Sequence, residues 1–107
     1  MSKLRVLAEA ESEANEAAWW YEQAEPGLGS EFLQAVEAAY AAVVSDLAPL
    51  VRVPHKAGRR GLKRFVLARF PYDVIVYPNR GQLVVIAIAH HARRPGYWSK
   101  RLKSSAK

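Results

Sequence analysis

The side chains best able to do chemistry are basic and gather near the end of the chain. Two adjacent histidines, His90 and His91, are followed by Arg93 and Arg94, and Tyr97 comes shortly after. Such cations can bind a phosphate or an acidic protein segment, and a histidine at a strand end can act as an acid or base. A hydrogen-bonded structural role is equally open for His90. Neighbours in a strand point to opposite faces, so the two histidines do not readily serve one reaction or one metal.

The wider basic set is large enough to define a surface. Its members are Lys56, Arg59, Arg60, Lys63, Arg64, Arg69, Arg80, Arg93, Arg94, Lys100 and Arg101. Charged side chains are mostly solvated, so each one alone says little. Together they predict a groove, flanked by residues 56–64 and 93–101, that attracts phosphate or an acidic protein segment.

Charge is divided between the two halves of the chain. Residues 1–47 carry nine acids against Lys3 and Arg5, a balance of −7, and residues 48–107 carry fourteen Lys and Arg against Asp73 alone, a balance of +13; the halves add to +6. Field strength follows local charge, so this division predicts two surfaces with different partners.

Composition excludes several classes of protein. The 107 residues fit a single domain, with residues 91–107 as a basic C-terminal tail. Without cysteine there are no disulfides, thiolate metal sites or thiol nucleophiles. No apolar run is long enough to span a membrane, so a soluble cytoplasmic protein without membrane contacts is expected. No Gly-rich phosphate loop, nucleophile elbow or paired carboxylate site appears, so neither an ordinary hydrolase nor a cofactor is expected, and no metal.

Hydrophobic periodicity predicts two helices after a short strand. Residues 4–7 form the strand candidate, and from Ala8 apolar residues recur at helical spacing. Residues 25–29 hold the Pro and Gly of a turn, Ser30 is placed to cap the second helix, and Pro49 stops it. The result is a helical hairpin with Ala-rich faces that can approach closely.

A sheet is expected to follow the hairpin. Residues 50–61 show neither the helical nor the strand spacing of apolar residues, which predicts an exposed basic loop. Strands are expected at residues 62–69, 72–77 and 83–90, with a hairpin turn at 79–81. The last strand is apolar on both faces, so it should be central, and residues 99–107 should fray. The fold class is therefore α+β: an N-terminal strand and an α-helical hairpin packed on a mainly antiparallel β-sheet.

Two aromatic groups need separate explanations. Trp19, Trp20 and Tyr21 are consecutive on the first helix and cannot all face one core. We expect Trp20 and Tyr21 in the core and Trp19 exposed, where it could anchor a partner. Tyr97 and Trp98 are expected to pack the tail on the sheet, with stacking on a nucleic-acid base as the alternative.

Three groups of strings, in this order, resemble the RelE/ParE superfamily of toxins from type II toxin–antitoxin systems. They are Trp20-Tyr21-Glu22 followed by Pro26-Gly27-Leu28-Gly29 and Phe32-Leu33; Arg64 through Phe70-Pro71-Tyr72; and Ala89-His90 followed by Arg93-Arg94-Pro95-Gly96-Tyr97-Trp98. The resemblance spans residues 3 to about 98. It is closer to the ParE-like, plasmid-stabilisation branch than to the ribosome-dependent nucleases.

The resemblance implies a growth-inhibiting toxin, held in a hetero-oligomeric complex by a cognate antitoxin protein. Members of the superfamily poison DNA gyrase or cut mRNA on the ribosome. Asp73 stands where the family often has an arginine, and an acid there would repel phosphate, which favours gyrase binding over RNA cleavage. A domain that binds its antitoxin but has lost toxicity is a third possibility.

The resemblance also assigns residues. If the chain is a nuclease, the counterparts of the catalytic residues are Arg64, His90, Arg93 and Tyr97. The residues expected to bind the antitoxin or the target are Trp19, Lys56, Arg59, Arg60, Lys63, Arg69, Arg94 and Trp98.

Overall fold

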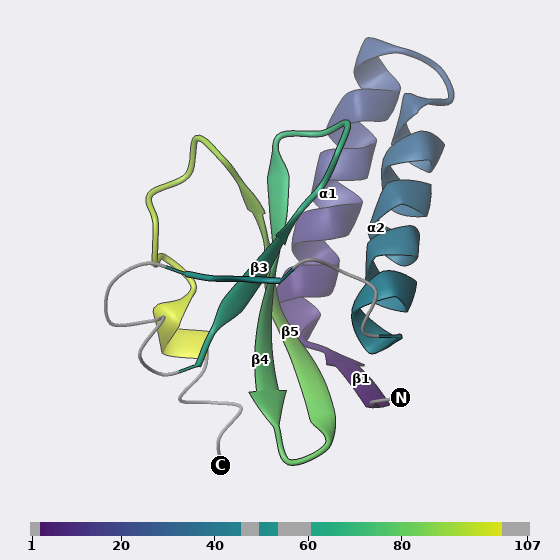
Figure 1. The fold of residues 1–107 in the computed structure, drawn as a ribbon. Coiled ribbons are helices and arrows are strands. Elements are labelled where there is room, and N and C mark those ends of the chain that lie inside the picture. Colours follow the sequence, from purple (N-terminus) through teal and green to yellow (C-terminus); the bar gives the residue numbers. More distant parts are fainter. Residues whose placement is uncertain (1–2, 46–49, 54–60, 102–107) are drawn as a thin grey trace.

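Two helices cover one face of a five-stranded sheet, and the C-terminal segment lies on the other side (Figure 1). The computed structural model describes residues 3–45, 50–53 and 61–101. Its elements are β1 (Lys3–Val6), α1 (Ala8–Ala24), α2 (Leu28–Val44), β2 (Val51–Arg52), β3 (Lys63–Val66), β4 (Tyr72–Asn79) and β5 (Gln82–His90). The strand order is β1-β5-β4-β3-β2, with β1 parallel to β5 and the other pairs antiparallel. The predicted α+β class is confirmed.

The helical hairpin forms as predicted, but its second helix begins earlier than expected. Gly27, not Ser30, is the residue before α2, and it offers no side chain to cap the helix. The carboxylate of Glu22 on α1 accepts hydrogen bonds from the backbone N–H groups of Gly27 and Gly29 at 3.0–3.1 Å. A carboxylate at the N-terminus of a helix accepts hydrogen bonds from backbone N–H groups that have no partner within the helix, and its negative charge complements the helix dipole. The cap is therefore supplied across the turn by the preceding helix.

Close packing of the two helices depends on Gly29. A Cβ atom at this position would collide with the backbone oxygen of Ala18, so a larger residue would force the helices apart. Small residues of α1, including Ala10, Ala14 and Ala17, are buried beneath α2 and the sheet. Neither helix among the described residues is long and apolar enough to cross a membrane.

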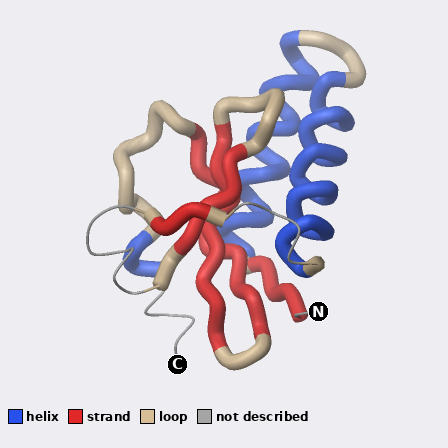
Figure 2. The backbone as a smooth tube through the Cα atoms, viewed as in Figure 1, coloured by secondary structure: helices blue, strands red, loops and turns tan. Residues whose placement is uncertain are grey.

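Strand β5 is an interior strand of the sheet with two apolar faces, as predicted, and Figure 2 shows it between the helices and the C-terminal loop. Val85 and Ile88 pack in the cluster under the helices, whereas Val84 and Ile86 belong to a second cluster on the opposite face. The pairing with β4 shifts register at Ile86, so this residue is a bulge.

The turn between β4 and β5 follows the predicted hairpin. Arg80 and Gly81 both have positive φ, 48° and 76°, as a two-residue hairpin turn requires. Other boundaries differ from expectation. Strand β2 forms inside the segment expected to be a loop, and β3 ends at Val66, three residues before the predicted end at Arg69. Residues 99–101, which were expected to fray, form a helical turn.

One prediction for the core is wrong. Trp20 is 62% exposed and lies beside Trp19, which is 55% exposed, with the ring centroids 5.0 Å apart. Helical spacing turns the two rings outward because Ala17, Ala18 and Tyr21 already fill the face toward the sheet. The exposure expected of Trp19 is confirmed. Trp98 packs as expected and is only 5% exposed.

Candidate functional site

A cavity of about 330 Å³ opens on the sheet face that the helices leave uncovered. Apolar side chains of the second cluster form its wall, among them Val53, Ile75 and Trp98. Polar side chains also line it: Arg64, Asp73, His90, His91, Arg93 and Arg94. Strands β3, β4 and β5 and the segment after β5 each contribute, so the fold brings together residues as far apart in the sequence as Val53 and Trp98.

Asp73 is the polar centre of this cavity. It is buried, with 8% exposure, and its Oδ1 lies 2.8 Å from Nε2 of His91. The Arg64 guanidinium lies 3.6 Å from the other carboxylate oxygen. The negative charge that the sequence analysis expected to repel phosphate is faced here by the Arg64 guanidinium and the His91 imidazole. A carboxylate in this position orients an imidazole.

His91 is a candidate site residue that the sequence analysis did not select. Asp73 on β4 pairs with Ala89 on β5, so the residue two positions after Ala89 lies diagonally across from Asp73 on the same side of the sheet. The strand register is the signal that identifies His91. His90, which the sequence analysis favoured, contacts the Tyr72 ring edge to face at 4.9 Å. Its Nδ1 accepts the backbone N–H of Ala92 at 2.9 Å.

Tyr97 and Arg93 form a stacked pair at the cavity mouth. The Arg93 guanidinium carbon lies 3.9 Å from the centroid of the Tyr97 ring, a cation–π geometry. The phenol oxygen donates a hydrogen bond to Glu13 on α1. Burial and this hydrogen bond raise the pKa of Tyr97 above its ordinary value. The hydroxyl of Tyr97 is thus engaged with a carboxylate and held in its neutral form.

Two other predicted residues, Lys63 and Arg69, do not line this cavity. Lys63 neighbours Arg64 in β3 but pairs with Val76, a residue of the helix-side cluster, so its side chain is on the face away from the cavity. Arg69 forms an ion pair with Glu31 of α2 at 2.9 Å. Lys56, Arg59 and Arg60 lie outside the described residues.

A second, smaller hollow of about 200 Å³ lies between α1 and the end of β5. It is lined by Glu13, Glu16, Ala17, Trp20, Tyr72, Ile88, His90 and Arg93. Two residues, His90 and Arg93, therefore line both hollows. Within the described ranges, no three His, Asp or Glu side chains are grouped so that they could hold a metal ion.

Comparison with solved structures identifies the kind of fold. No protein-family model matches the sequence, and no curated protein matches it. Among solved structures, a chain described as "Chromosomal ParDE TA system from P. aeruginosa" superimposes with a TM-score of 0.71 at 13% sequence identity, covering 84% of this chain and 96% of that one. The chain therefore has an α+β fold of the RelE/ParE kind, as the sequence predicted.

Proposed function

We propose that this chain is the toxin component of a type II toxin–antitoxin pair and that it inhibits growth by binding DNA gyrase. The observation that carries the proposal is the fold shared, over 84% of the chain, with a chain of a ParDE toxin–antitoxin system. The sequence strings that resemble the ParE-like branch favour gyrase as the target. The cavity that holds Arg64, Arg93 and Arg94 supplies a basic surface suited to an acidic partner.

A supercoiling assay tests the target. Purified wild-type protein is expected to block the supercoiling of relaxed plasmid by gyrase, and Arg94→Gln, which removes one exposed charge from the cavity, is expected to weaken the block. Arg5→Gln is the matched control, because Arg5 lies in β1, outside the cavity. Unchanged supercoiling at an excess of folded wild-type protein would exclude gyrase.

Cleavage of mRNA is a second candidate, favoured by the pairing of Asp73 with His91 beside Arg64. In this reaction His91, oriented by Asp73, accepts the proton of a ribose 2′-hydroxyl as that oxygen attacks phosphorus. The P–O5′ bond breaks, the departing oxygen takes a proton from water, and a 2′,3′-cyclic phosphate remains. Arg64 stabilises the negative charge that grows on the phosphate.

Primer extension on translated mRNA distinguishes this candidate from gyrase inhibition. If RNA is the target, the wild type produces cuts, and His91→Ala loses most of them, because general acid–base catalysis contributes on the order of 10²-fold or more in rate. Arg5→Gln keeps its activity, because Arg5 lies in β1, outside the cavity. Growth arrest without cuts excludes cleavage.

A cognate antitoxin is the partner proposed under either target. The complex is hetero-oligomeric and cytoplasmic, and the exposed pair Trp19 and Trp20 offers the antitoxin an aromatic anchor. Coexpression with the product of the adjacent reading frame is expected to copurify both chains and restore growth. A chain that binds the antitoxin but leaves growth normal when expressed alone would instead be a binding domain without toxicity.

A further inference from the structure

The outer edge of β5 is only half covered by a strand. β1 pairs with β5 from Gln82 to Val85, whereas β5 continues to His90. An uncovered strand edge leaves backbone donors and acceptors open and invites pairing with another chain. The bulge at Ile86 lies where the cover of β1 ends.

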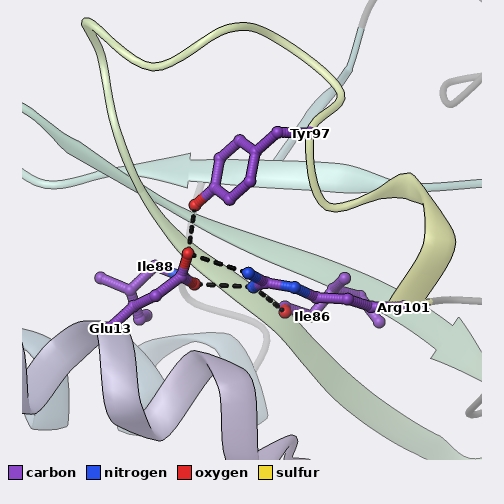
Figure 3. A network of polar contacts seen from close by, with 5 residues as sticks. All are labelled: Glu13, Ile86, Ile88, Tyr97 and Arg101. Atoms are coloured by element: carbon purple, nitrogen blue, oxygen red, sulfur yellow. Dashed lines mark hydrogen bonds and ion pairs between the residues drawn. The ribbon is translucent and has the colours of Figure 1, made fainter.

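Side chains take the place of the missing strand, and Figure 3 shows the arrangement. The backbone N–H of Ile88 donates to Oε1 of Glu13 at 3.1 Å, and the carbonyl of Ile86 accepts from Arg101 at 3.1 Å. Arg101 also holds both oxygens of the Glu13 carboxylate, at 2.8 and 3.1 Å. The Glu13 side chain is 16% exposed, so this ion pair is largely withdrawn from water.

Glu13 accepts one further hydrogen bond, from the hydroxyl of Tyr97. One carboxylate of the acidic helix thus holds two separate points of the basic C-terminal segment, Tyr97 and Arg101. A bidentate arginine–carboxylate pair with additional donors is a strong and directional arrangement. The Tyr97 ring in turn lies under the guanidinium of Arg93, 3.9 Å away. The chain of contacts therefore runs from α1 to the mouth of the cavity.

We propose that Glu13 is a positioning residue for the cavity: it fixes Tyr97 and Arg101 on the uncovered edge of β5 and so holds Arg93 at the boundary between the two hollows. Arg93 is exposed and follows a strand end, so few backbone contacts constrain its side chain. Its guanidinium stacks on the Tyr97 ring. The expected effect on growth inhibition rests on the proposed function, whereas the position of Arg93 can be tested without it.

The decisive variant is Glu13→Gln, which keeps the shape of the side chain and removes its charge. Its matched control is Glu16→Gln: Glu16 lies on the same helix, lines the same small hollow and makes no hydrogen bond or ion pair among the described residues. Both variants change the net charge equally, so a difference between them reports the contacts of Glu13.

The first readout is the proton NMR shift of the Arg93 δ-methylene group, which the Tyr97 ring moves upfield. We expect Glu13→Gln to lose more than half of this upfield displacement and Glu16→Gln to retain it. A purely structural role would lower stability without releasing Arg93 in the folded protein. Retention of the full displacement in folded Glu13→Gln would overturn the proposal.

A second variant guards against loss of folding. Tyr97→Phe retains the ring but removes the hydrogen bond to Glu13, so the ring and Arg93 should become mobile and the displacement should shrink. An unchanged displacement in this variant would also contradict the proposal.

The second readout is growth inhibition in cells that express the chain. Glu13→Gln should reduce it and Glu16→Gln should leave it unchanged. Full toxicity of Glu13→Gln would overturn the functional consequence. A wild type without toxicity would contradict the proposed function, and the NMR result would still decide the role of Glu13.

Discussion

Asp73, the single acid of the basic half, lies at the polar centre of the cavity. Its carboxylate lies between His91 and Arg64 and is almost fully buried. Asp73→Ala is expected to lower the free energy of unfolding by about 2 kcal/mol, because Arg64 and His91 lose their partner. Urea unfolding measures this, with Glu16→Ala as the control. Equal stability of the two variants would show that the Asp73 contacts contribute nothing.

Burial raises the pKa of four tyrosines, Tyr21, Tyr40, Tyr72 and Tyr97, and so makes the stability depend on alkaline pH. Burial and the hydrogen bond to Glu13 raise the pKa of Tyr97 above 10.0. Burial, with the charges of Glu37 and Glu11, raises the pKa of Tyr40 to about 12. Below pH 10 both phenols are neutral in the folded and unfolded chains, and this contribution to stability is fully present. Above pH 10 the unfolded chain releases these protons first, so the free energy of unfolding falls as pH rises.

Denaturant unfolding from neutral pH to above pH 10 tests this dependence. The wild type should lose stability steadily over the upper part of the range, and Tyr97→Phe should lose less, since it has one raised phenol fewer. An identical slope in both proteins would mean that Tyr97 titrates normally in the folded state.

At the scale of elements, the turn between the helices is fixed by Glu22. Glu22→Ala is expected to cost about 1 kcal/mol, because Gly27 and Gly29 lose the carboxylate that accepts their N–H groups. Gln23→Ala, at the neighbouring exposed position, is the control and should stay within about 0.5 kcal/mol of the wild type. Thermal or urea unfolding provides the comparison, and equal losses would remove Glu22 as the cap.

Elements with a strong period were predictable from the sequence, and their contacts with distant residues were not. Apolar residues at helical spacing predicted both helices, and the two apolar faces of β5 predicted an interior strand. These predictions held because burial requires apolar residues on the covered faces. Strand β2 has two residues, too few to show any period. Trp20 was misplaced because composition cannot tell which side of an alanine-rich helix the sheet covers.

The candidate site was predictable to a similar degree. Arg64, His90, Arg93 and Arg94 were selected from the sequence, and all four line one cavity. His91 was missed because its role follows from the register between β4 and β5. Other parts of the site depend on still longer connections. Glu13 and Arg101 are 88 positions apart, and only the completed fold brings them together.

At the scale of the whole molecule, the charge division coincides with the architecture. The acidic half supplies β1 and the helical hairpin, and the basic half supplies most of the sheet and the C-terminal segment. Glu13 and Arg101, like Glu31 and Arg69, join the halves through ion pairs. Among the described residues, the acidic and basic halves are thus joined by these two ion pairs.

The exposed aromatic pair allows binding to be separated from folding. Replacing both Trp19 and Trp20 by Ser should leave the free energy of unfolding within about 1 kcal/mol, since both rings are mostly in water. If the proposed antitoxin binds here, its affinity should fall on the order of tenfold or more, as is typical when aromatic anchors are truncated. Calorimetric titration against the antitoxin measures this, with Arg5→Gln as a surface control. Unchanged affinity would place the antitoxin elsewhere.

Growth on induction of the chain, with and without coexpression of the proposed antitoxin, tests the central claim most directly. The wild type is expected to reduce colony counts sharply, and coexpression of the antitoxin should restore them. The double variant Arg64→Gln and Arg94→Gln, which removes two charges from the cavity, should lose toxicity while remaining folded. Normal growth of cells that contain folded wild-type protein without antitoxin would contradict the account.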